Sequence, residues 1–185
     1  MRERDTNGPG RERHARVVIT GFMAAGKTTV ARALAALLGC QMADTDELVR
    51  EREGRTPAAI IEAEGEARFR EIESRALADA LAYDGPLVVA TGGGTWAVAV
   101  NRALVAERGC LAVWLDAPFD LCWRRITGEV ESAERPLARD VHQARALYDA
   151  RRPSYALAPV RVPVREGDTP DETARRSALS LAAYG

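Results

Sequence analysis

The chain has 185 residues, about the length of one domain, and a formal net charge of -1 from 26 basic and 27 acidic residues. Hydrophobic residues make up 46% of it, a fraction typical of soluble globular proteins, so a disordered chain is excluded. The balanced charge argues against a nucleic-acid partner, because proteins that bind nucleic acids carry a basic face. We expect a monomer.

The cysteines Cys40, Cys110 and Cys122 are far apart, so the sequence indicates neither a zinc site nor a disulfide framework. No apolar stretch is long enough to cross a bilayer, which argues against a membrane protein. Residues 1–15 are polar and lack the apolar core of a signal peptide. We therefore expect a cytoplasmic protein that begins with a disordered tail over residues 1–15.

The first third of the chain alternates short apolar segments with amphipathic ones. Arg16–Thr20 is short and rich in β-branched residues, which predicts a buried strand. Residues 27–38 have apolar positions at helical spacing, and Gly39 is placed to end this helix. A short strand over 41–43 then leads into a helix that Gly54 stops.

The middle of the chain is predicted to be mainly helical. Pro57 and Gly65 enclose a short helix, and residues 66–83 form a long one. The strand predicted over 86–91 is followed by three consecutive glycines, at positions 92–94.

Strand and helix continue to alternate to the end of the chain. The remaining predicted elements are a helix over 98–107, a strand over 110–115, a helix from Pro118, a helix over 140–150, a strand over 160–164 and a helix from Pro170. This alternation predicts a single α/β domain over residues 16–185. Its three layers, α/β/α, have a mostly parallel five-stranded sheet at the centre.

Residues 21–28, GFMAAGKT, match the phosphate-binding pattern G-x-x-x-x-G-K-[ST]. The glycines let backbone N–H groups point at phosphate oxygens, beside the N-terminus of the following helix. In such a loop Lys27 reaches the β- and γ-phosphates, and the Thr28 hydroxyl coordinates Mg²⁺. A predicted strand precedes the motif and a helix follows it, as a nucleotide site requires. Lys27 is also the only lysine in the chain.

Two carboxylates follow the second predicted strand, where a doubly wound sheet opens its ligand crevice. Asp44 and Asp46 are two residues apart, so one can face a metal while the other accepts a hydrogen bond from a substrate hydroxyl. A kinase needs such a carboxylate near the attacking oxygen. The alternative is that this run only caps a helix.

Glycines 92–94 end a buried strand, where they permit close approach of the backbone to a ligand; a plain tight turn is the alternative. Arg70 lies in a predicted helix near this crevice, Arg135 begins the sequence R-P-L and Arg151 begins R-R-P-S-Y. Each of them taken singly is more typical of a solvated surface charge. Their positions are informative only together.

Together these motifs resemble, in order, the shikimate kinases, a family of phosphate-loop kinases related to nucleoside-monophosphate kinases. The resemblance runs from Val17 to about Val164. Besides the loop, the matching patterns are D-T-D at 44–46, F-R-x-x-E at 69–73, G-G-G at 92–94, R-P-L at 135–137 and R-x-P-x-Y at 151–155. The resemblance implies the phosphate-loop NTPase fold, with a mobile lid over about 128–139.

The resemblance also implies how the substrates bind. ATP, the co-substrate, would be held by Ala24, Ala25, Gly26, Lys27, Thr28, Thr29 and Arg135 of the lid, with Mg²⁺ at Thr28 and Asp44. Shikimate would be held by Asp46, Arg70, Gly92, Gly93, Gly94 and Arg151. In this scheme the catalytic residues are Lys27, Asp46, as the base, and Arg135. Arginines suit the shikimate carboxylate because a guanidinium binds it bidentately and stays charged.

Some residues depart from the family pattern. Ala24 stands where the family usually has glycine, for which we expect at most a change in nucleotide affinity. Trp96 is bulkier than expected, and core packing or a wall of the acceptor pocket would explain it. Three acidic residues in the lid, Glu129, Glu131 and Glu134, have no explanation.

The leading hypothesis is phosphorylation of the 3-hydroxyl of shikimate, which gives 3-phosphoshikimate and ADP. One alternative is a kinase for another polyol or sugar acid, such as gluconate, which the three arginines disfavour. The other is a nucleotide-binding regulatory module without catalysis. The intact Lys27, Thr28, Asp44 and Asp46 argue against that module.

Overall fold

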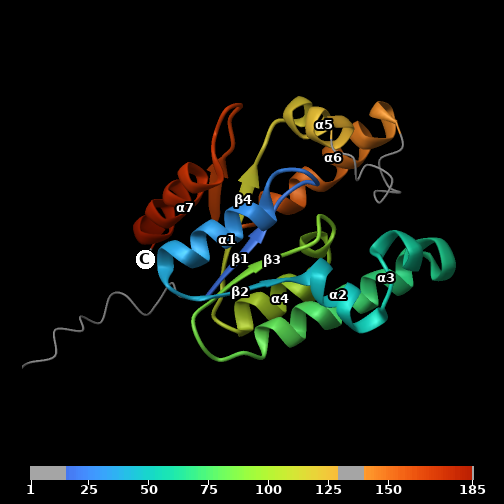
Figure 1. Cartoon of the computed structure of the whole chain (residues 1–185), viewed down its shortest axis with the longest axis horizontal. Helices are drawn as coiled ribbons and strands as arrows, with labels where there is room; N and C mark the ends of the chain where they lie inside the picture. The colour runs from blue at the N-terminus through green and yellow to red at the C-terminus, as the bar shows by residue number, and fades with distance from the viewer. Residues whose placement is uncertain (1–15, 129–139, 185) are drawn as a thin grey trace, which may run out of the picture.

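The five strands of the structure form one parallel sheet in the order β2-β3-β1-β4-β5. The strands are β1 (Arg16–Thr20), β2 (Gln41–Asp44), β3 (Leu87–Ala90), β4 (Leu111–Asp116) and β5 (Val160–Pro163). The structure is a computed structural model, and it describes residues 16–128 and 140–184 (Figure 1). Inner strands β1, β3 and β4 are runs of buried aliphatic residues, as expected where helices cover both faces.

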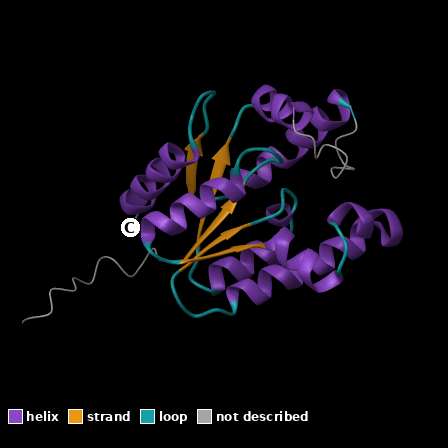
Figure 2. Ribbon diagram, viewed as in Figure 1, coloured by secondary structure: helices purple, strands orange, loops and turns teal. Residues whose placement is uncertain are grey.

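Helices cover the sheet on two sides (Figures 1 and 2). On one side α1 (Lys27–Leu38) packs on α7 (Pro170–Tyr184). The other side carries the second half of α3 (Pro57–Leu81), the 3₁₀ turn η1 (Thr95–Ala97), α4 (Ala99–Glu107) and α6 (Val141–Tyr155), with α5 (Phe119–Gly128) packed on α6. The short α2 (Thr45–Glu53) packs against α3. The predicted α/β/α arrangement with a five-stranded sheet is therefore confirmed.

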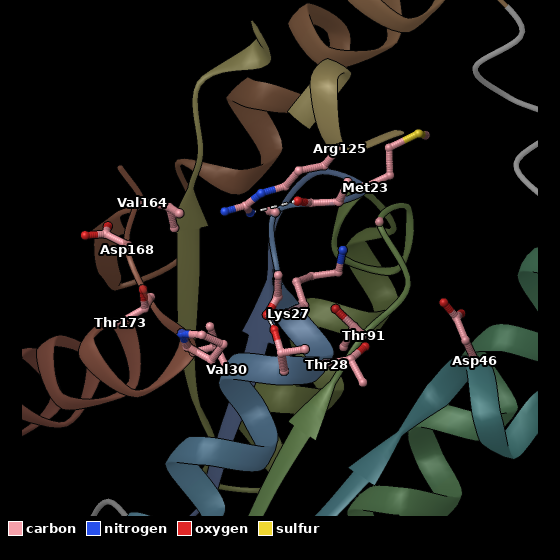
Figure 3. Close-up of a pocket in the computed structure, with 16 residues that line it drawn as sticks. Met23, Lys27, Thr28, Val30, Asp46, Thr91, Arg125, Val164, Asp168 and Thr173 are labelled. Carbon is pink, nitrogen blue, oxygen red and sulfur yellow. Dashed lines mark hydrogen bonds between the residues drawn. The ribbon is translucent and has the colours of Figure 1, made fainter. Parts of the chain in front are cut away.

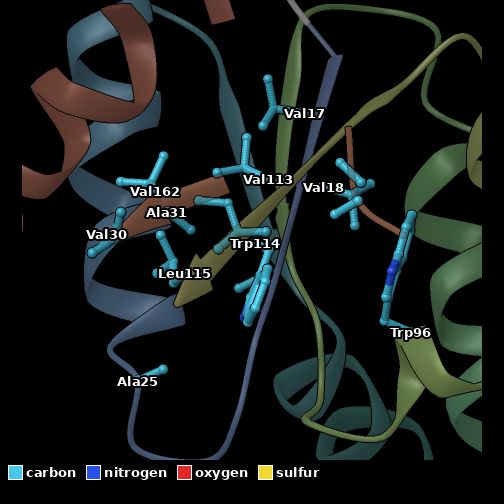
Figure 4. Packing of buried hydrophobic residues seen from close by; sticks show 14 of the residues in the cluster. Val17, Val18, Ala25, Val30, Ala31, Trp96, Val113, Trp114, Leu115 and Val162 are labelled. Carbon is cyan, nitrogen blue, oxygen red and sulfur yellow. The ribbon is translucent and has the colours of Figure 1, made fainter. Parts of the chain in front are cut away.

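The core is built by the alternation of side chains along the strands. Figure 4 shows Val30 and Ala31 of α1 on the same side of the sheet as Leu115, and Trp96 on the opposite side, beside Val18. Trp96 is itself buried in this core. The sheet thus joins two apolar layers, and its register places the ends of β1, β2 and β3 level with one another.

Hydrogen bonds tie these strand ends together. The N–H and hydroxyl of Thr91 both donate to the carbonyl of Ile19, at 3.1 and 3.0 Å. The N–H of Gly92 donates to the Thr45 hydroxyl at 3.0 Å. The loops that follow β1, β2 and β3 therefore meet at one edge of the sheet, as the switch in strand order requires.

Most predicted elements agree with the structure to within a residue or two. The helix predicted over 140–150 is too short, because α6 continues through Pro153 to Tyr155. Its last turn is held by tertiary contacts that the local pattern does not reveal. In α3 the backbone leaves the helical region at Gly65 (φ 86°), where the sequence predicts a break between two helices.

Some predictions fall on residues that the structure does not describe. These are the tail over 1–15 and the lid beyond residue 128, with Arg135 and the three lid glutamates.

Cys40, Cys110 and Cys122 are free thiols. Within residues 16–128 and 140–184, every helix is too short or too polar to span a bilayer.

Candidate active site

The phosphate loop and the N-terminus of α1 form the floor of a cleft of about 630 Å³ (Figure 3). Gly26 precedes α1 with a positive φ of 93°, which turns the chain into the helix. The N–H of Ala25 and the Nζ of Lys27 both donate to the carbonyl of Phe22, at 3.2 and 3.0 Å. The loop is thus closed around its own backbone, with the exposed N–H groups of the helix start facing the cleft.

Ala24 adopts the left-handed backbone conformation (φ 57°) that glycine accommodates without strain. Its carbonyl accepts a hydrogen bond from Nη1 of Arg125 at 3.1 Å, drawn as a dashed line in Figure 3. The departure from glycine therefore keeps the shape of the loop but adds steric cost.

Thr28 and Asp44 form a direct pair between the loop and the end of β2. The Thr28 hydroxyl donates to Oδ2 of Asp44 at 2.7 Å. The other carboxylate oxygen of Asp44 caps α2, accepting from the N–H groups of Asp46 (2.9 Å) and Glu47 (3.4 Å). Asp44 therefore caps α2 with one oxygen and contacts Thr28 of the phosphate loop with the other. Its role toward Mg²⁺ stays a prediction.

This pair fits the requirements of Mg²⁺. The ion takes hard oxygen ligands, and in nucleotide sites the protein supplies only one or two of them beside the phosphates. Thr28 and Asp44 offer a hydroxyl and a carboxylate oxygen 2.7 Å apart. No cluster of three or more His, Cys, Asp or Glu side chains that could hold a metal ion occurs in the described ranges.

Asp46 lines the same cleft from the first turn of α2. Desolvation by the surrounding protein raises the pKa of its carboxyl to about 6, and the negative charges of Asp44 and Glu73 act in the same direction. The positive charges of Lys27 and Arg50 oppose this shift. A carboxyl with this pKa is ionised at neutral pH and can still accept a proton, which suits a general base.

Each glycine of the G-G-G turn faces a different charged group. A Cβ on Gly92 would lie 2.0 Å from the carboxylate of Glu73, and one on Gly94 would lie 2.2 Å from Nη1 of Arg70. Gly93 lies beside Arg151, whose Nη1 would be 3.5 Å from such a Cβ. The turn is therefore more than a tight bend, because it lets the backbone approach two guanidinium groups and a carboxylate.

Arg151 is buried, with 8% of its surface exposed, and burial lowers the pKa of its guanidinium. No carboxylate lies within ion-pair distance of it in the ranges 16–128 and 140–184. A buried cation without an anionic partner is costly, and a bound anion would relieve that cost. The buried guanidinium of Arg151 is therefore suited to bind an anion next to Gly93.

Arg70 is held differently, by carboxylates of its own helix. Its Nη1 donates to Glu73 at 2.7 Å and its Nη2 to Glu66 at 2.8 Å. Glu73 is 1% exposed, so this ion pair fixes the guanidinium against the backbone of Gly94. The last residue of the F-R-x-x-E pattern is thus the group that orients its arginine.

Two residues next to Arg151 fix the end of α6. Arg152 donates to both carboxylate oxygens of Asp116, at 2.9 and 3.4 Å, and Tyr155 donates its hydroxyl proton to the carbonyl of Gly93. Burial raises the pKa of Tyr155 to about 12, so it remains a donor. Together these contacts anchor the helix turn that carries Arg151.

The cleft continues past the loop to residues that the sequence analysis missed. Arg125, Val164, Asp168 and Thr173 line the side opposite Asp46, with Lys27 and Thr28 between the two sides (Figure 3). Pro170 also lines the cleft. An apolar wall beside a guanidinium and polar groups suits a purine base. These residues belong to no recognisable motif, and only the fold brings α5 and the start of α7 to the loop.

The structure therefore brings the predicted residues to one edge of the sheet, except for Arg135, which lies outside the described residues. The predicted residues that meet there are Ala24, Ala25, Gly26, Lys27, Thr28, Thr29, Asp44, Asp46, Arg70, Gly92, Gly93, Gly94 and Arg151. Trp96 is 4% exposed and packs in the apolar core, as the first of the two explanations predicts.

The model of one protein family, shikimate kinase, matches residues 23–181. The chain belongs to the shikimate kinase family. It is 40% identical over 189 residues to a shikimate kinase of Cereibacter sphaeroides, an alignment that covers 98% of this chain and 92% of that one. The solved structure of the Acinetobacter baumannii shikimate kinase in complex with shikimate superposes with a TM-score of 0.79 and 31% identity, covering 90% and 92% of the two chains.

Members of the shikimate kinase family are ATP-dependent phosphotransferases, and this chain is accordingly an enzyme of that class. A gluconokinase from Sinorhizobium meliloti has the same fold, with a TM-score of 0.62 over 93% of this chain, but only 18% identity. That likeness concerns the fold and does not favour gluconate as the acceptor.

Proposed function

We propose that this shikimate kinase family member transfers the γ-phosphoryl group of ATP to the 3-hydroxyl of shikimate, giving 3-phosphoshikimate and ADP. The observation that carries the proposal is Arg151, a buried guanidinium without a carboxylate partner among the described residues. It lies beside Gly93, which lines the cleft together with Asp46 and the phosphate loop. The enzyme would act as a cytoplasmic monomer.

In this proposal ATP lies along the loop, with its base between Arg125 and Pro170 and its phosphates at the start of α1. Lys27 neutralises charge on the β- and γ-phosphates. Mg²⁺, held through Thr28 and Asp44, would supply further positive charge to the same oxygens. Arg135 of the lid would close over them and exclude water.

The acceptor would be oriented by its two ends. Arg151 and Arg70 bind its carboxylate, and the carboxylate of Asp46 accepts hydrogen bonds from its hydroxyls. Asp46 then takes the proton of the attacking hydroxyl, for which its raised pKa is suited. Since the phosphoryl-transfer transition state demands little covalent chemistry, alignment and charge account for most of the catalysis.

The experiment is an ADP-release assay with ATP and Mg²⁺ that compares shikimate, quinate and gluconate with no acceptor. Of the three acceptors, we expect only shikimate to give strong turnover. Turnover that is equal on gluconate would contradict the assignment of Arg70 and Arg151 to a cyclic carboxylate. The variant Lys27→Ala, which should fold but not turn over, controls for contaminating kinases.

A further inference from the structure

A second cavity, of about 650 Å³, lies at the opposite end of the sheet from the active site. It is bounded by the start of β4, the last turns of α4 and α7, and the segment between α6 and β5. This volume is within the range of small-molecule sites, and such sites combine a mainly apolar wall with a few polar groups. Nothing in the proposed kinase mechanism uses this cavity.

The wall is apolar apart from one charged group. Val105, Leu157 and Tyr184 contribute aliphatic and aromatic surface. Leu157 and Tyr184 are 61% and 56% exposed, which is unfavourable for side chains of this size. Arg102 is the only charged side chain of the cavity wall within the described residues.

Arg102 is held in place while part of its guanidinium stays available. Its Nη1 donates to the carbonyls of Trp96 and Ala97, at 2.7 and 3.0 Å. Its Nη2 and Nε have no hydrogen-bond or ion-pair partner in the ranges 16–128 and 140–184. The side chain is half-buried, so an anion that reached these two donors would be partly shielded from water.

We propose that this cavity is a binding site for a small aromatic or alicyclic carboxylate. Its ring would cover the exposed faces of Leu157 and Tyr184, and its carboxylate would accept hydrogen bonds from Nη2 and Nε of Arg102. The apolar wall selects a ring and the single fixed guanidinium selects one negative charge, so neither a neutral ring nor a polyanion satisfies both.

The site is connected to the acceptor residues through short paths. Arg102 holds the carbonyls of η1, which directly follows the G-G-G turn. Leu157 lies just beyond α6, the helix that carries Arg151. A ligand here would contact Trp96 of η1 and Leu157, two residues after the end of α6. Because η1 and α6 frame the proposed shikimate carboxylate site, we infer that the two ligands affect each other's affinity.

The probe is 2-naphthoate, titrated calorimetrically into the full chain saturated with a non-hydrolysable ATP analogue, so that the nucleotide cleft is filled. We expect Arg102→Gln to weaken binding about tenfold or more, as the loss of charge-assisted hydrogen bonds implies. Ala106→Trp, which fills the cavity from the exposed surface of α4, should abolish binding. The affinity for the neutral amide 2-naphthamide should be the same in Arg102→Gln as in the wild type.

Arg175→Gln is the matched control, since this exposed arginine of α7 does not line the cavity and its loss should leave the affinity unchanged. Absence of 2-naphthoate binding, or binding that neither Arg102→Gln nor Ala106→Trp affects, would overturn the site. A dimer in sedimentation that Ala106→Trp dissociates would instead assign the face to a second copy of the chain.

The coupling has its own readout, which does not depend on turnover. The dissociation constant of 2-naphthoate should change about fivefold or more when shikimate saturates the protein, a coupling of ordinary size. An unchanged constant would overturn the coupling while leaving the site. If shikimate fails to bind in calorimetry, the proposed function is wrong. The second site is judged separately, by whether Arg102→Gln weakens the binding of 2-naphthoate.

Discussion

Ala24 has the only positive φ outside glycine in the described ranges, and it lies in the phosphate loop. Replacing it with glycine should remove the clash of its Cβ with the backbone and raise the free energy of unfolding by about 1 kcal/mol. The midpoint of thermal unfolding should rise by about 2–4 °C, measured by circular dichroism. Ala36→Gly, within the regular part of α1, should instead lower it. If Ala24→Gly and Ala36→Gly shifted the midpoint equally, the backbone at Ala24 would not be strained.

Asp46 leads to a prediction about pH. Because its pKa is about 6, the carboxylate needed as a base is lost below that pH, and kcat/KM for shikimate should fall about tenfold for each further pH unit. Arg50 lowers this pKa, so Arg50→Gln should move the acid limb of the profile to higher pH. Asp46→Asn should bind ATP but lose turnover. An acid limb near pH 4 in the wild type would contradict the role of Asp46 as base.

The backbone of Gly94 lies close to the guanidinium of Arg70, and a substitution can test whether this packing matters for the acceptor site. A Cβ there would overlap the guanidinium of Arg70, so Gly94→Ala should displace it and raise KM for shikimate about tenfold or more, with KM for ATP little changed. A rise in both KM values would indicate general damage to the sheet edge instead.

At the scale of elements, α6 is a helix whose position is set by a charged contact with the sheet. Asp116, 8% exposed at the end of β4, pairs with Arg152 and with Arg161 of β5, and both guanidiniums lie over the ring of Trp114. Arg151 directly precedes Arg152 in α6, so the direction of its side chain depends on this contact.

Arg152→Ala should therefore release the end of α6 and raise KM for shikimate about tenfold, while KM for ATP stays nearly constant. Arg152→Lys should restore part of the affinity, because it keeps a charge for Asp116. Arg145→Ala is a control on the same helix, since its pair with Asp149 is exposed. If Arg152→Ala leaves shikimate kinetics unchanged, α6 is positioned by other contacts.

Most element boundaries could be predicted, because they depend on local chemistry. Gly39 and Gly54 end α1 and α2 in the left-handed conformation, and Gly65 breaks α3, as expected from residues that accept a positive φ. The end of α6 could not be predicted. Pro153 indicates a stop, and the contacts that override it, from Arg152 and Tyr155, involve residues 36 and 62 positions away.

At the scale of the whole molecule, nucleotide and shikimate should stabilise the fold independently of each other. A ligand at 100 times its dissociation constant adds about 2.7 kcal/mol to the free energy of unfolding, a shift of about 5–10 °C in a chain of this size. An ATP analogue and shikimate should each produce such a shift in a thermal melt. Arg151→Ala should lose the shikimate shift and keep the nucleotide shift. Loss of both would mean that Arg151 supports the fold and not the acceptor.

The sequence by itself determined the class of fold, the phosphate loop and the family, because these depend on local periodicity and on short motifs in a fixed order. It also named most residues of the proposed site. Only the tertiary structure decided how they act together: that Asp44 serves both α2 and Thr28, that Arg151 is buried without a carboxylate partner among the described residues, and that Arg125 completes the nucleotide cleft. Burial and charge at a site are set by contacts between distant segments, which no local pattern encodes.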